Sequence, residues 1–272
     1  MKKNLFILKL GGSVVTRKNK ETLSVRRALL ATIARELKKF REHSDHDIIL
    51  IHGAGAIGHR LAHEYGLRTG TGKDARKWHG AILSRLANQT LNARVAKTLI
   101  EEGVPVTPVH TSSVTGNRNG KLSRCFLAPI VHALRSGCVP LLYGDMVFDD
   151  ALGMSICSGD TIAARLAARM GAQKVFFATD VDGIFTKDPH KYRDATLVKK
   201  IRLRELLHGE NIRLASSHNI DVTGGIRGKI GAFENLNARH LEEIVIFNGL
   251  DSCLYKNHLF GKKARGTIIK IS

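Results

Sequence analysis

One segment of the chain reads Asp47-Ile48-Ile49-Leu50-Ile51-His52-Gly53-Ala54-Gly55-Ala56-Ile57-Gly58-His59. It begins with a short apolar run rich in isoleucine, which predicts a buried strand, and the glycines that follow predict a turn that opens a helix. Backbone N–H groups at the start of a helix bind anions. The segment therefore predicts an α/β protein with an anion site at the end of this strand.

The three glycines of this turn have the GxGxxG spacing of a dinucleotide fingerprint, which also needs an acidic residue at the end of the next strand. Asp74 has a suitable separation, but residues 59–73 contain no strand pattern to carry it. The GxxxxGK[ST] phosphate loop fails because His59 and Arg60 replace the required Lys and Ser or Thr. An anion-binding helix N-terminus remains, at which His59 either donates a hydrogen bond to the anion or is a surface histidine without a ligand.

A second glycine turn, Gly11-Gly12-Ser13, follows the apolar run at residues 5–10. Glycine allows backbone N–H groups to approach an anion closely, and Ser13 adds a hydroxyl donor. Lys9 stands within the apolar run, where burying an unpaired ammonium is costly. We therefore expect Lys9 to face a phosphate, the alternative being that it reaches solvent at the strand end.

Two further turns lie in the second half of the chain. Thr179-Asp180-Val181-Asp182-Gly183 follows an apolar run and suits contacts to a ribose or an adenine at the carboxyl edge of a sheet. Asp221-Val222-Thr223-Gly224-Gly225 precedes a helical pattern that places Lys229 one turn inside the helix. Each turn alone is compatible with an ordinary loop, but together the glycine loops indicate a phosphate-binding site.

Short apolar runs alternate with longer amphipathic ones, a pattern typical of a mostly parallel sheet covered by helices. The pattern predicts strands at residues 5–10, 47–51, 104–109, 139–143, 174–179, 243–248 and 267–271, the last at a sheet edge, and helices at 24–41, 75–102 and 161–170. Ser24 is the expected N-cap of the first helix. Residues 116–120 and 149–153 are predicted hairpin turns. No linker separates domains, and a boundary between two lobes is expected near Ser158.

The composition fits one large α/β unit or two closely joined lobes, with 272 residues of which 43% are hydrophobic. No apolar run approaches the ~18 residues that span a bilayer, so no membrane association is expected. The N-terminal run reads as a first strand and not as a signal peptide, so a cytoplasmic location is expected. The four cysteines form no CxxC pair and are expected to be buried free thiols. The thirteen histidines show no metal-ligand spacing, so no protein metal site is predicted.

The formal net charge is +19, spread along the whole length. A positive field draws anionic substrates such as ATP and phosphate esters toward a cleft. RNA binding would explain the same charge, as would a merely solvated basic surface. Aromatic residues make up only 6% of the chain and no RNP-like aromatic strand occurs, so no specific nucleic-acid partner is expected.

Together these segments resemble the amino acid kinase family from residue 5 to about residue 248. Lys9-Leu10-Gly11-Gly12-Ser13 is similar to its first phosphate loop, and Thr179-Asp180-Val181-Asp182-Gly183 with Thr186-Lys187-Asp188-Pro189 is similar to its nucleotide edge. Within the family, Gly58-His59, Ser158-Gly159-Asp160 and Asp221-Val222-Thr223-Gly224-Gly225 resemble the isopentenyl phosphate kinases.

The resemblance implies an αβα sandwich whose mostly parallel sheet runs through an acceptor-binding lobe, residues 1–157, and an ATP-binding lobe, residues 158–272. It also implies a homodimer, with ATP and Mg²⁺ as the phosphoryl donor. The residues that would hold ATP are Lys9, Gly11, Gly12, Ser13, Asp180, Gly225 and Lys229. Those that would hold the acceptor are Gly53, Ala54, Gly58, His59 and Gly159. Catalysis is implied for Lys9, Lys18, His59 and Lys229.

Two residues depart from the family pattern. Ala54 replaces a glycine that is usual in the middle of its loop, so the backbone there must avoid the left-handed region. Ile57 replaces a common aromatic residue and is expected to alter the pocket wall.

The reaction implied by the resemblance is phosphorylation of isopentenyl phosphate to isopentenyl diphosphate, in the alternative mevalonate pathway. A phosphate monoester has a second pKa of about 6, so its oxygen is an anionic nucleophile without a general base. An isoprenoid tail needs an apolar pocket, for which Ala81, Ile82, Leu86 and Ala87 near Trp78 are candidate wall residues, the alternative being that most of them face the core.

Three other functions fit parts of the pattern. A fosfomycin kinase also resembles the chain around Gly58-His59. A sensor that binds nucleotide without catalysis would have little use for Lys9, Lys18 and Lys229 together. A basic RNA-binding protein without kinase activity would use the +19 charge alone.

Overall fold

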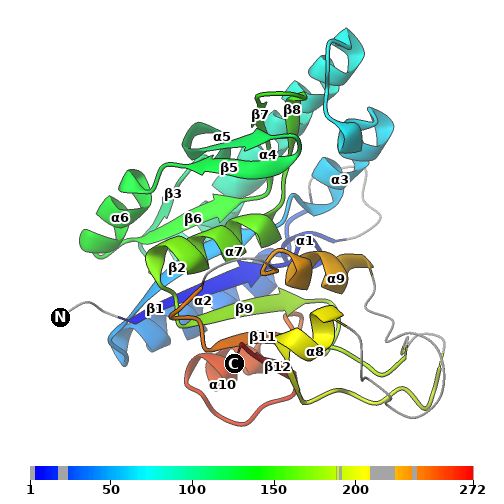
Figure 1. Cartoon of the computed structure of the whole chain (residues 1–272). Coiled ribbons are helices and arrows are strands. Elements are labelled where there is room, and N and C mark those ends of the chain that lie inside the picture. The colour runs from blue at the N-terminus through cyan, green and yellow to red at the C-terminus, as the bar shows by residue number, and fades with distance from the viewer. Residues whose placement is uncertain are drawn as a thin grey trace.

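The computed structural model describes residues 4–17, 24–187, 189, 192–208, 224–234 and 238–271. These residues form a large sheet and a smaller one, with helices packed against both faces of the large sheet (Figure 1). The strands are β1 (Asn4–Leu10), β2 (His46–His52), β3 (Val106–Pro108), β4 (Thr115–Arg118), β5 (Lys121–Cys125), β6 (Val139–Tyr143), β7 (Asp145–Asp149), β8 (Gly153–Cys157), β9 (Lys174–Thr179), β10 (Lys200–Arg202), β11 (Glu243–Asn248) and β12 (Thr267–Lys270).

The large sheet has the strand order β10-β12-β11-β9-β1-β2-β6-β3, and only the pair β11–β12 is antiparallel. The central strand β1 pairs with β2 and β9, and Leu10 is aligned with His52 and Ala178. Since these three strands are parallel and end in register, the loops that follow them emerge side by side. This register brings the first glycine turn, the second glycine turn and Asp180 to one edge of the sheet.

The predicted αβα sandwich with a mostly parallel sheet is confirmed. The strand predicted at the sheet edge is wrong in its placement, because β12 lies between β10 and β11. The edge strand β10 was not predicted, since its three residues carry a single apolar side chain and give no period. The division into lobes at residue 158 stays a prediction; hydrogen bonding between β1 and β9 is continuous across it.

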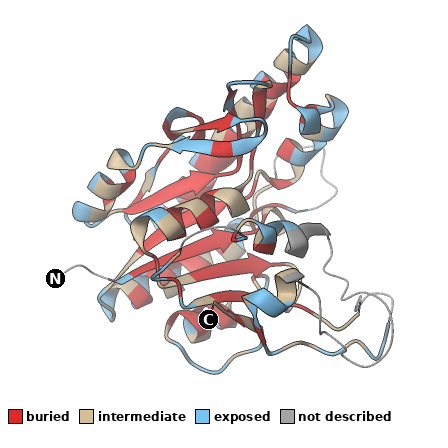
Figure 2. Ribbon diagram, viewed as in Figure 1, coloured by how far each residue is buried: buried red, intermediate tan, exposed pale blue. Residues whose placement is uncertain are grey.

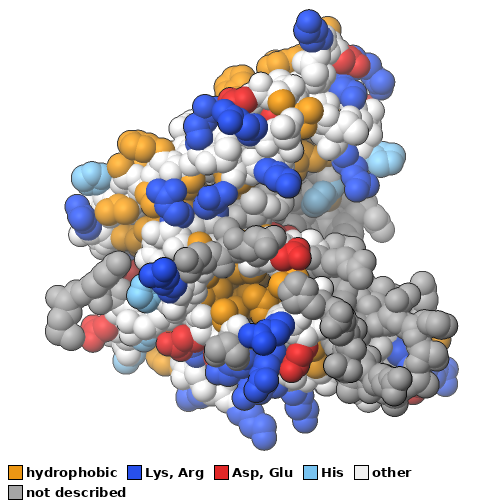
Figure 3. Space-filling model, in the orientation of Figure 1, with side chains coloured by type: hydrophobic (Ala, Val, Ile, Leu, Met, Phe, Trp, Pro, Cys, Tyr) orange, Lys and Arg blue, Asp and Glu red, His pale blue; other side chains and the backbone are white. Residues whose placement is uncertain are grey.

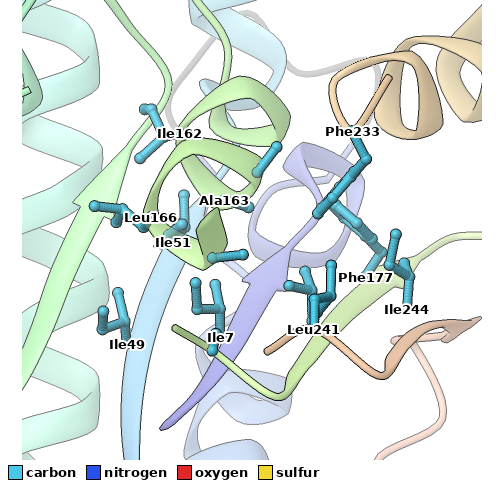
Figure 4. Close-up of a cluster of buried hydrophobic side chains, with 14 of the residues drawn as sticks. Ile7, Ile49, Ile51, Ile162, Ala163, Leu166, Phe177, Phe233, Leu241 and Ile244 are labelled. Carbon is cyan, nitrogen blue, oxygen red and sulfur yellow. The ribbon is translucent and has the colours of Figure 1, made fainter. Parts of the chain in front are cut away.

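The alternating side chains of β1 enter two different cores. Leu5 and Ile7 pack on the same side as α7 (Gly159–Met170), whereas Phe6, Leu8 and Leu10 pack on the side of α2 (Arg27–Glu42). Figure 4 shows the first core, and in Figure 2 the central strands of the large sheet are buried along most of their length. Burial on both faces explains why the strands read as continuous apolar runs.

The remaining helices surround this sheet or bear on the site. They are α1 (Gly12–Val15), α3 (Gly55–Glu64), the 3₁₀ helix η1 (Leu67–Thr69), α4 (Ala75–Glu101), α5 (Thr111–Val114), α6 (Ala128–Arg135), α8 (Leu203–His208), α9 (Gly224–Gly231) and α10 (Cys253–Leu259). The expected N-cap at Ser24 is wrong: α2 has Arg26 as its N-cap, and the Ser24 carbonyl accepts from the Arg17 N–H. Asp74 caps α4 by accepting from the N–H groups of the first turn, which explains the acid at this position.

The smaller sheet has the order β5-β4-β7-β8 and contains both predicted hairpins. Asn119 and Gly120 have φ of 50° and 73°, the left-handed values that an Asn-Gly hairpin turn requires. The helix α4 packs against β7. This arrangement places the start of β7 and the end of β8 beside the loops at the edge of the large sheet.

The expectation of buried cysteines holds only for Cys157, because Cys125 and Cys138 are half-buried and Cys253 is exposed; all four are free thiols. Among the described residues, no helix is both long enough and apolar enough to cross a membrane. Lysine and arginine side chains are scattered over the face of the molecule that Figure 3 shows, in keeping with the charge spread along the sequence.

Candidate active site

A cavity of about 420 Å³ lies where β1, β2 and β9 end, between these strands, α3, α4, the small sheet and the start of α7. Its lining residues are Lys9, Gly11, Gly12, Ser13, Thr16, Gly53, Ala54, Gly55, Ala56, Gly58, His59, Ala62, Ser84, Asn88, Gly144, Asp145, Met146, Ile156, Cys157, Ser158, Gly159, Asp160, Thr179, Asp180 and Lys229. Segments from the whole length of the chain therefore meet in one space.

The first glycine loop (residues 11–13) and the second glycine loop (residues 53–58) are in backbone contact. The Gly53 N–H donates to the Leu10 carbonyl at 3.0 Å, which ties the second loop to the end of β1. A Cβ atom at Gly53 would lie 2.7 Å from the Gly12 nitrogen, so no larger residue fits there. Glycine is thus required where the two glycine loops approach each other.

The second glycine loop leads into α3, and its backbone angles agree with the residue type at each position. Ala54 has φ −62° and ψ −11°, so it avoids the left-handed region as expected, and Gly55 takes φ +68° instead. No side chain of the N-cap residue satisfies the first N–H groups of α3. A Cβ at Gly58 would lie 2.6 Å from Asn88 Oδ1, which explains this glycine by its packing on α4. The N-terminal residues of α3 line the cavity, and a helix N-terminus suits an anion.

Two lysines flank one carboxylate inside the cavity. Lys9 Nζ lies 2.9 Å from Asp160 Oδ1, and Lys229 Nζ lies 3.6 Å from Asp160 Oδ2. Their side chains are 7% and 14% exposed. Desolvation by burial lowers the pKa of Lys229, the charge of Lys9 lowers it further, and the charge of Asp160 opposes both. The carboxylate therefore keeps two cations together, aimed at a space where an anion would be strongly held.

His59 lies in the first turns of α3, beside the first glycine loop: a Cβ at Gly12 would lie 3.8 Å from its Nε2. The residue as a whole is exposed. Desolvation lowers the pKa of His59, and the charges of Lys9 and Lys229 lower it further. The imidazole is therefore neutral at pH 7 in the free protein and has an N–H to donate.

The amino acid kinase family model matches residues 4–248. The chain belongs to this family. It is 34% identical to the isopentenyl phosphate kinase of Methanothermobacter thermautotrophicus, over 97% of the chain and 98% of the relative. It is 30% identical to the isopentenyl phosphate kinase of Thermoplasma acidophilum, over 90% of the chain and 92% of the relative. A crystal structure of an isopentenyl phosphate kinase superposes with a TM-score of 0.83 at 30% identity, covering 98% of this chain and 100% of that one.

Most of the residues predicted to form the site of this family member line the one cavity described. They are Lys9, Gly11, Gly12, Ser13, Gly53, Ala54, Gly58, His59, Gly159, Asp180 and Lys229. Gly225 lies in the first turn of α9, the helix that carries Lys229. Lys18 lies outside the described residues, as do Asp221, Val222 and Thr223.

Asp160 is a site residue that sequence reasoning missed, although its motif Ser158-Gly159-Asp160 was noticed. Ser158 caps α7 by accepting from the Thr161 N–H at 3.1 Å, which places Asp160 in the first turn of the helix. A Cβ at Gly159 would lie 3.5 Å from Lys9 Cε, so the backbone passes close to that lysine. The available signal was a buried lysine in β1, which demands a carboxylate partner.

None of the candidate wall residues on α4 is among the described residues that line the cavity. Ile82 and Leu86 are 58% and 60% exposed and point away from the cavity, and Ala81 packs against Met146. The same helix contributes Ser84 and Asn88 instead. With a period of 3.6 residues, positions 81, 84 and 88 share the inward face, whereas 82 and 86 lie on the outer one.

The far part of the cavity has mixed polarity, with Ala62, Met146 and Ile156 beside Ser84, Asn88 and Asp145. Asp145 Oδ1 accepts from Asn88 Nδ2 at 3.1 Å and from the Met146 N–H at 2.9 Å. Burial raises the pKa of Asp145 to about 6 against these hydrogen bonds. The cavity thus combines apolar side chains with a buried carboxylate.

Beneath the second glycine loop, His52 is fully buried and uses both ring nitrogens. Its Nδ1 lies 2.8 Å from the Gly53 carbonyl and its Nε2 lies 3.1 Å from Asn92 Nδ2. Because a carbonyl only accepts, Nδ1 carries the proton and Nε2 accepts from the amide. Desolvation lowers the pKa of His52 to about 4, so the ring stays neutral.

Proposed function

We propose that the chain transfers the γ-phosphoryl group of ATP to isopentenyl phosphate, forming isopentenyl diphosphate and ADP. The observation that carries the proposal is the contact between two anion-binding glycine loops beside the Lys9–Asp160–Lys229 cluster. Such a site answers the main difficulty of the reaction, which is to bring two polyanions together. The two isopentenyl phosphate kinases similar to this chain over nine-tenths or more of its length support the choice of acceptor.

On the acceptor side, the monoester phosphate binds at the N-terminus of α3. Gly53, Ala54 and Gly58 offer backbone contacts, Gly159 approaches from the start of α7, and His59 donates a hydrogen bond. The second pKa of a phosphate monoester is about 6, so the attacking oxygen is ionised at neutral pH and needs no general base. The task of these residues is to orient that oxygen.

On the donor side, the first glycine loop, Lys9 and Lys229 hold the ATP phosphates, and Asp180 and Gly225 belong to the nucleotide end. The lysines stabilise the negative charge on the oxygens of the group in transit, and Lys18 is proposed to join them. Fixed charges in a partly desolvated site lower the barrier because they need no rearrangement during the reaction.

The carboxylates of the site fit a Mg²⁺ ion that is carried by the nucleotide. No cluster of three or more metal-ligating side chains occurs among the described residues. Kinase sites hold Mg²⁺ mainly through phosphates and water, with one or two carboxylates. Asp180, which follows β9 and lines the cavity, is the carboxylate that would contact the ion. When bound, Mg²⁺ would neutralise charge on the β- and γ-phosphates.

A screen of ATP consumption tests this function. The acceptors are isopentenyl phosphate, dimethylallyl phosphate, fosfomycin, UMP and N-acetylglutamate, and the control is Lys9→Met, which removes one cation. We expect the highest kcat/KM with isopentenyl phosphate and product identified as isopentenyl diphosphate. A preference for fosfomycin would reject the acceptor while keeping the kinase. Absence of turnover with every acceptor would reject the kinase function.

We also propose a homodimer in which an apolar face is covered by a second copy. Ile82 and Leu86 of α4 and Phe148 of β7 are more than half exposed, and the Arg85 guanidinium lies 5.7 Å from the centre of the Phe148 ring. Exposed apolar patches of this kind mark interaction surfaces. Light scattering should give a dimer mass for the wild type and a monomer mass for Leu86→Glu. Leu250→Glu, which changes an exposed residue after β11 and outside this face, should remain dimeric; a monomeric wild type would contradict the proposal.

The reaction supplies an isoprenoid precursor, which places it in the alternative mevalonate pathway. The cytoplasm is the proposed location, because ATP is the phosphoryl donor.

A further inference from the structure

One side chain outside the predicted site connects the two glycine loops directly. Thr16, which follows α1, is 2% exposed and lines the cavity. Its hydroxyl donates to the Gly12 carbonyl at 2.8 Å and accepts from the Ala56 N–H at 3.1 Å. A threonine hydroxyl has a single proton to donate. The hydroxyl proton of Thr16 therefore bonds to the first glycine loop, and a lone pair of the same oxygen accepts a hydrogen bond from the second.

The bond to Ala56 has a particular consequence for α3. The first N–H groups of a helix lack partners within the helix, and the N-cap residue Ala54 supplies no side-chain acceptor. Thr16 therefore caps α3 from a segment 40 residues earlier in the chain. Its methyl group also limits the loop, since a Cβ at Gly55 would lie 2.8 Å from Thr16 Cγ2. The hydroxyl and the methyl group together fix the start of α3 relative to Gly12.

The backbone that carries Thr16 is itself held in place. Arg26 Nε donates to the Ser13 carbonyl at 3.1 Å and to the Thr16 carbonyl at 3.3 Å. The Arg26 N–H donates to the Val15 carbonyl at 2.9 Å, and Thr16 forms a β-bridge with Val25. These contacts hold the backbone at Thr16 and so limit the direction of its side chain.

We propose that Thr16 is a positioning residue that sets the separation between the loop that holds the ATP phosphates and the loop that holds the acceptor phosphate. The inference rests on the proposed phosphoryl transfer. In-line transfer depends on the distance and alignment between the attacking oxygen and the γ-phosphorus, and a displacement of about 1 Å costs roughly 10²-fold in rate. Thr16 contributes to that alignment without contacting the reacting atoms.

The test compares two replacements of Thr16. Thr16→Val keeps the shape but removes both hydrogen bonds, whereas Thr16→Ser keeps the hydroxyl. We expect kcat of Thr16→Val to fall by about 10- to 100-fold, with the Kd of ATP measured separately within about threefold of wild type. Thr16→Ser should retain kcat within about threefold. Thr16→Val should also release ADP in excess of diphosphate product, because water competes for a misaligned phosphoryl group.

Thr98→Val is the matched control. Thr98 is 5% exposed, and its hydroxyl donates only to the Arg94 carbonyl, four residues earlier and away from the cavity. This variant loses a buried hydrogen bond of the same kind as the one between Thr16 and Gly12, but it breaks no contact between the loops. Its kcat should equal that of the wild type, whatever the change in thermal stability.

Several outcomes would overturn the role of Thr16. They are a kcat of Thr16→Val within twofold of wild type, an equal loss in Thr98→Val, and an equal loss in Thr16→Ser. The assays use the acceptor that the wild type turns over fastest, so a wrong acceptor assignment leaves the test intact. If no acceptor is turned over, crystal structures of the wild type and Thr16→Val decide the inference. An unchanged distance between the Gly12 carbonyl and the Ala56 N–H would reject it.

Discussion

The carboxylate of Asp160, in the first turn of α7, lies 2.9 Å from the ammonium of Lys9, in the middle of the large sheet. The contact stabilises a cation that β1 would otherwise bury alone. Because the second carboxylate oxygen faces Lys229, one negative charge holds two positive ones at the cavity.

Asp160→Asn should lower kcat by about 10²-fold, because the two ammonium groups then repel each other without a counter-charge. Asp160 raises the pKa of Lys229 against desolvation, so its loss lowers that pKa further. Lys229 then loses its proton at a lower pH, and the alkaline fall in kcat should move to lower pH. The control is Asp150→Asn, which removes a surface partner of Arg118 and Arg124. An unchanged alkaline limb in Asp160→Asn would contradict this account.

Lys229→Met and Lys18→Met should each lower kcat more than they raise KM for ATP. The reason is that charge on the transferring group grows in the transition state, where a nearby ammonium contributes most. Steady-state kinetics with ATP as the varied substrate measure the two effects. Lys39→Met, at an exposed ion pair with Glu36, should change neither. A variant with only a higher KM would make that lysine a nucleotide-binding residue without a role in the chemical step.

His59→Ala should lower kcat/KM for the acceptor by about 10²- to 10³-fold, since it removes one donor to the acceptor phosphate. His59→Gln, which keeps an N–H donor, should lose less. Near-normal kcat/KM in His59→Ala would show that the histidine does not bind the acceptor.

The pH profile separates the neutral from the charged form of His59. Its pKa is lowered below 6.5, so the neutral ring donates at neutral pH. The wild-type kcat/KM should therefore not decline as pH rises from 6.5 to 8, and His59→Gln should follow a parallel profile. A decline in the wild type that is absent in His59→Gln would mean that the imidazolium is the working form.

Acid should destabilise the protein through His52. Its pKa is about 4 in the folded state against 6.5 when solvated, so the neutral ring contributes stability that is complete above pH 6.5 and is lost as pH falls toward 4. The corresponding free energy is about 3 kcal/mol. Urea unfolding between pH 7 and 4 should show a smaller acid loss in His52→Asn, which keeps a donor near the Gly53 carbonyl but does not titrate. An equal loss of unfolding free energy in the wild type and in His52→Asn would show that His52 does not cause the acid destabilisation.

Much of the large sheet was predictable because its information is local. The runs at 139–143, 174–179 and 243–248 coincide with β6, β9 and β11, since strands buried on both faces are continuous apolar segments. The glycine loops were predictable for the same reason, because a turn and the start of a helix have local sequence signals. The short edge strand β10 has no such signal. The start of α2 at Arg27, which has no side-chain cap, has none either, and both were missed.

The sequence by itself predicted which loops would bind anions and that Lys9 would face a negatively charged group. Only the tertiary structure decided that this partner is Asp160, that Lys229 shares it, and that Thr16 links Gly12 to Ala56. The physical reason is that an ion pair or a hydrogen bond between distant segments depends on strand order and register, which short-range patterns do not encode. The parallel alignment of β1, β2 and β9 brings these segments together, and it exists only once the sheet has formed.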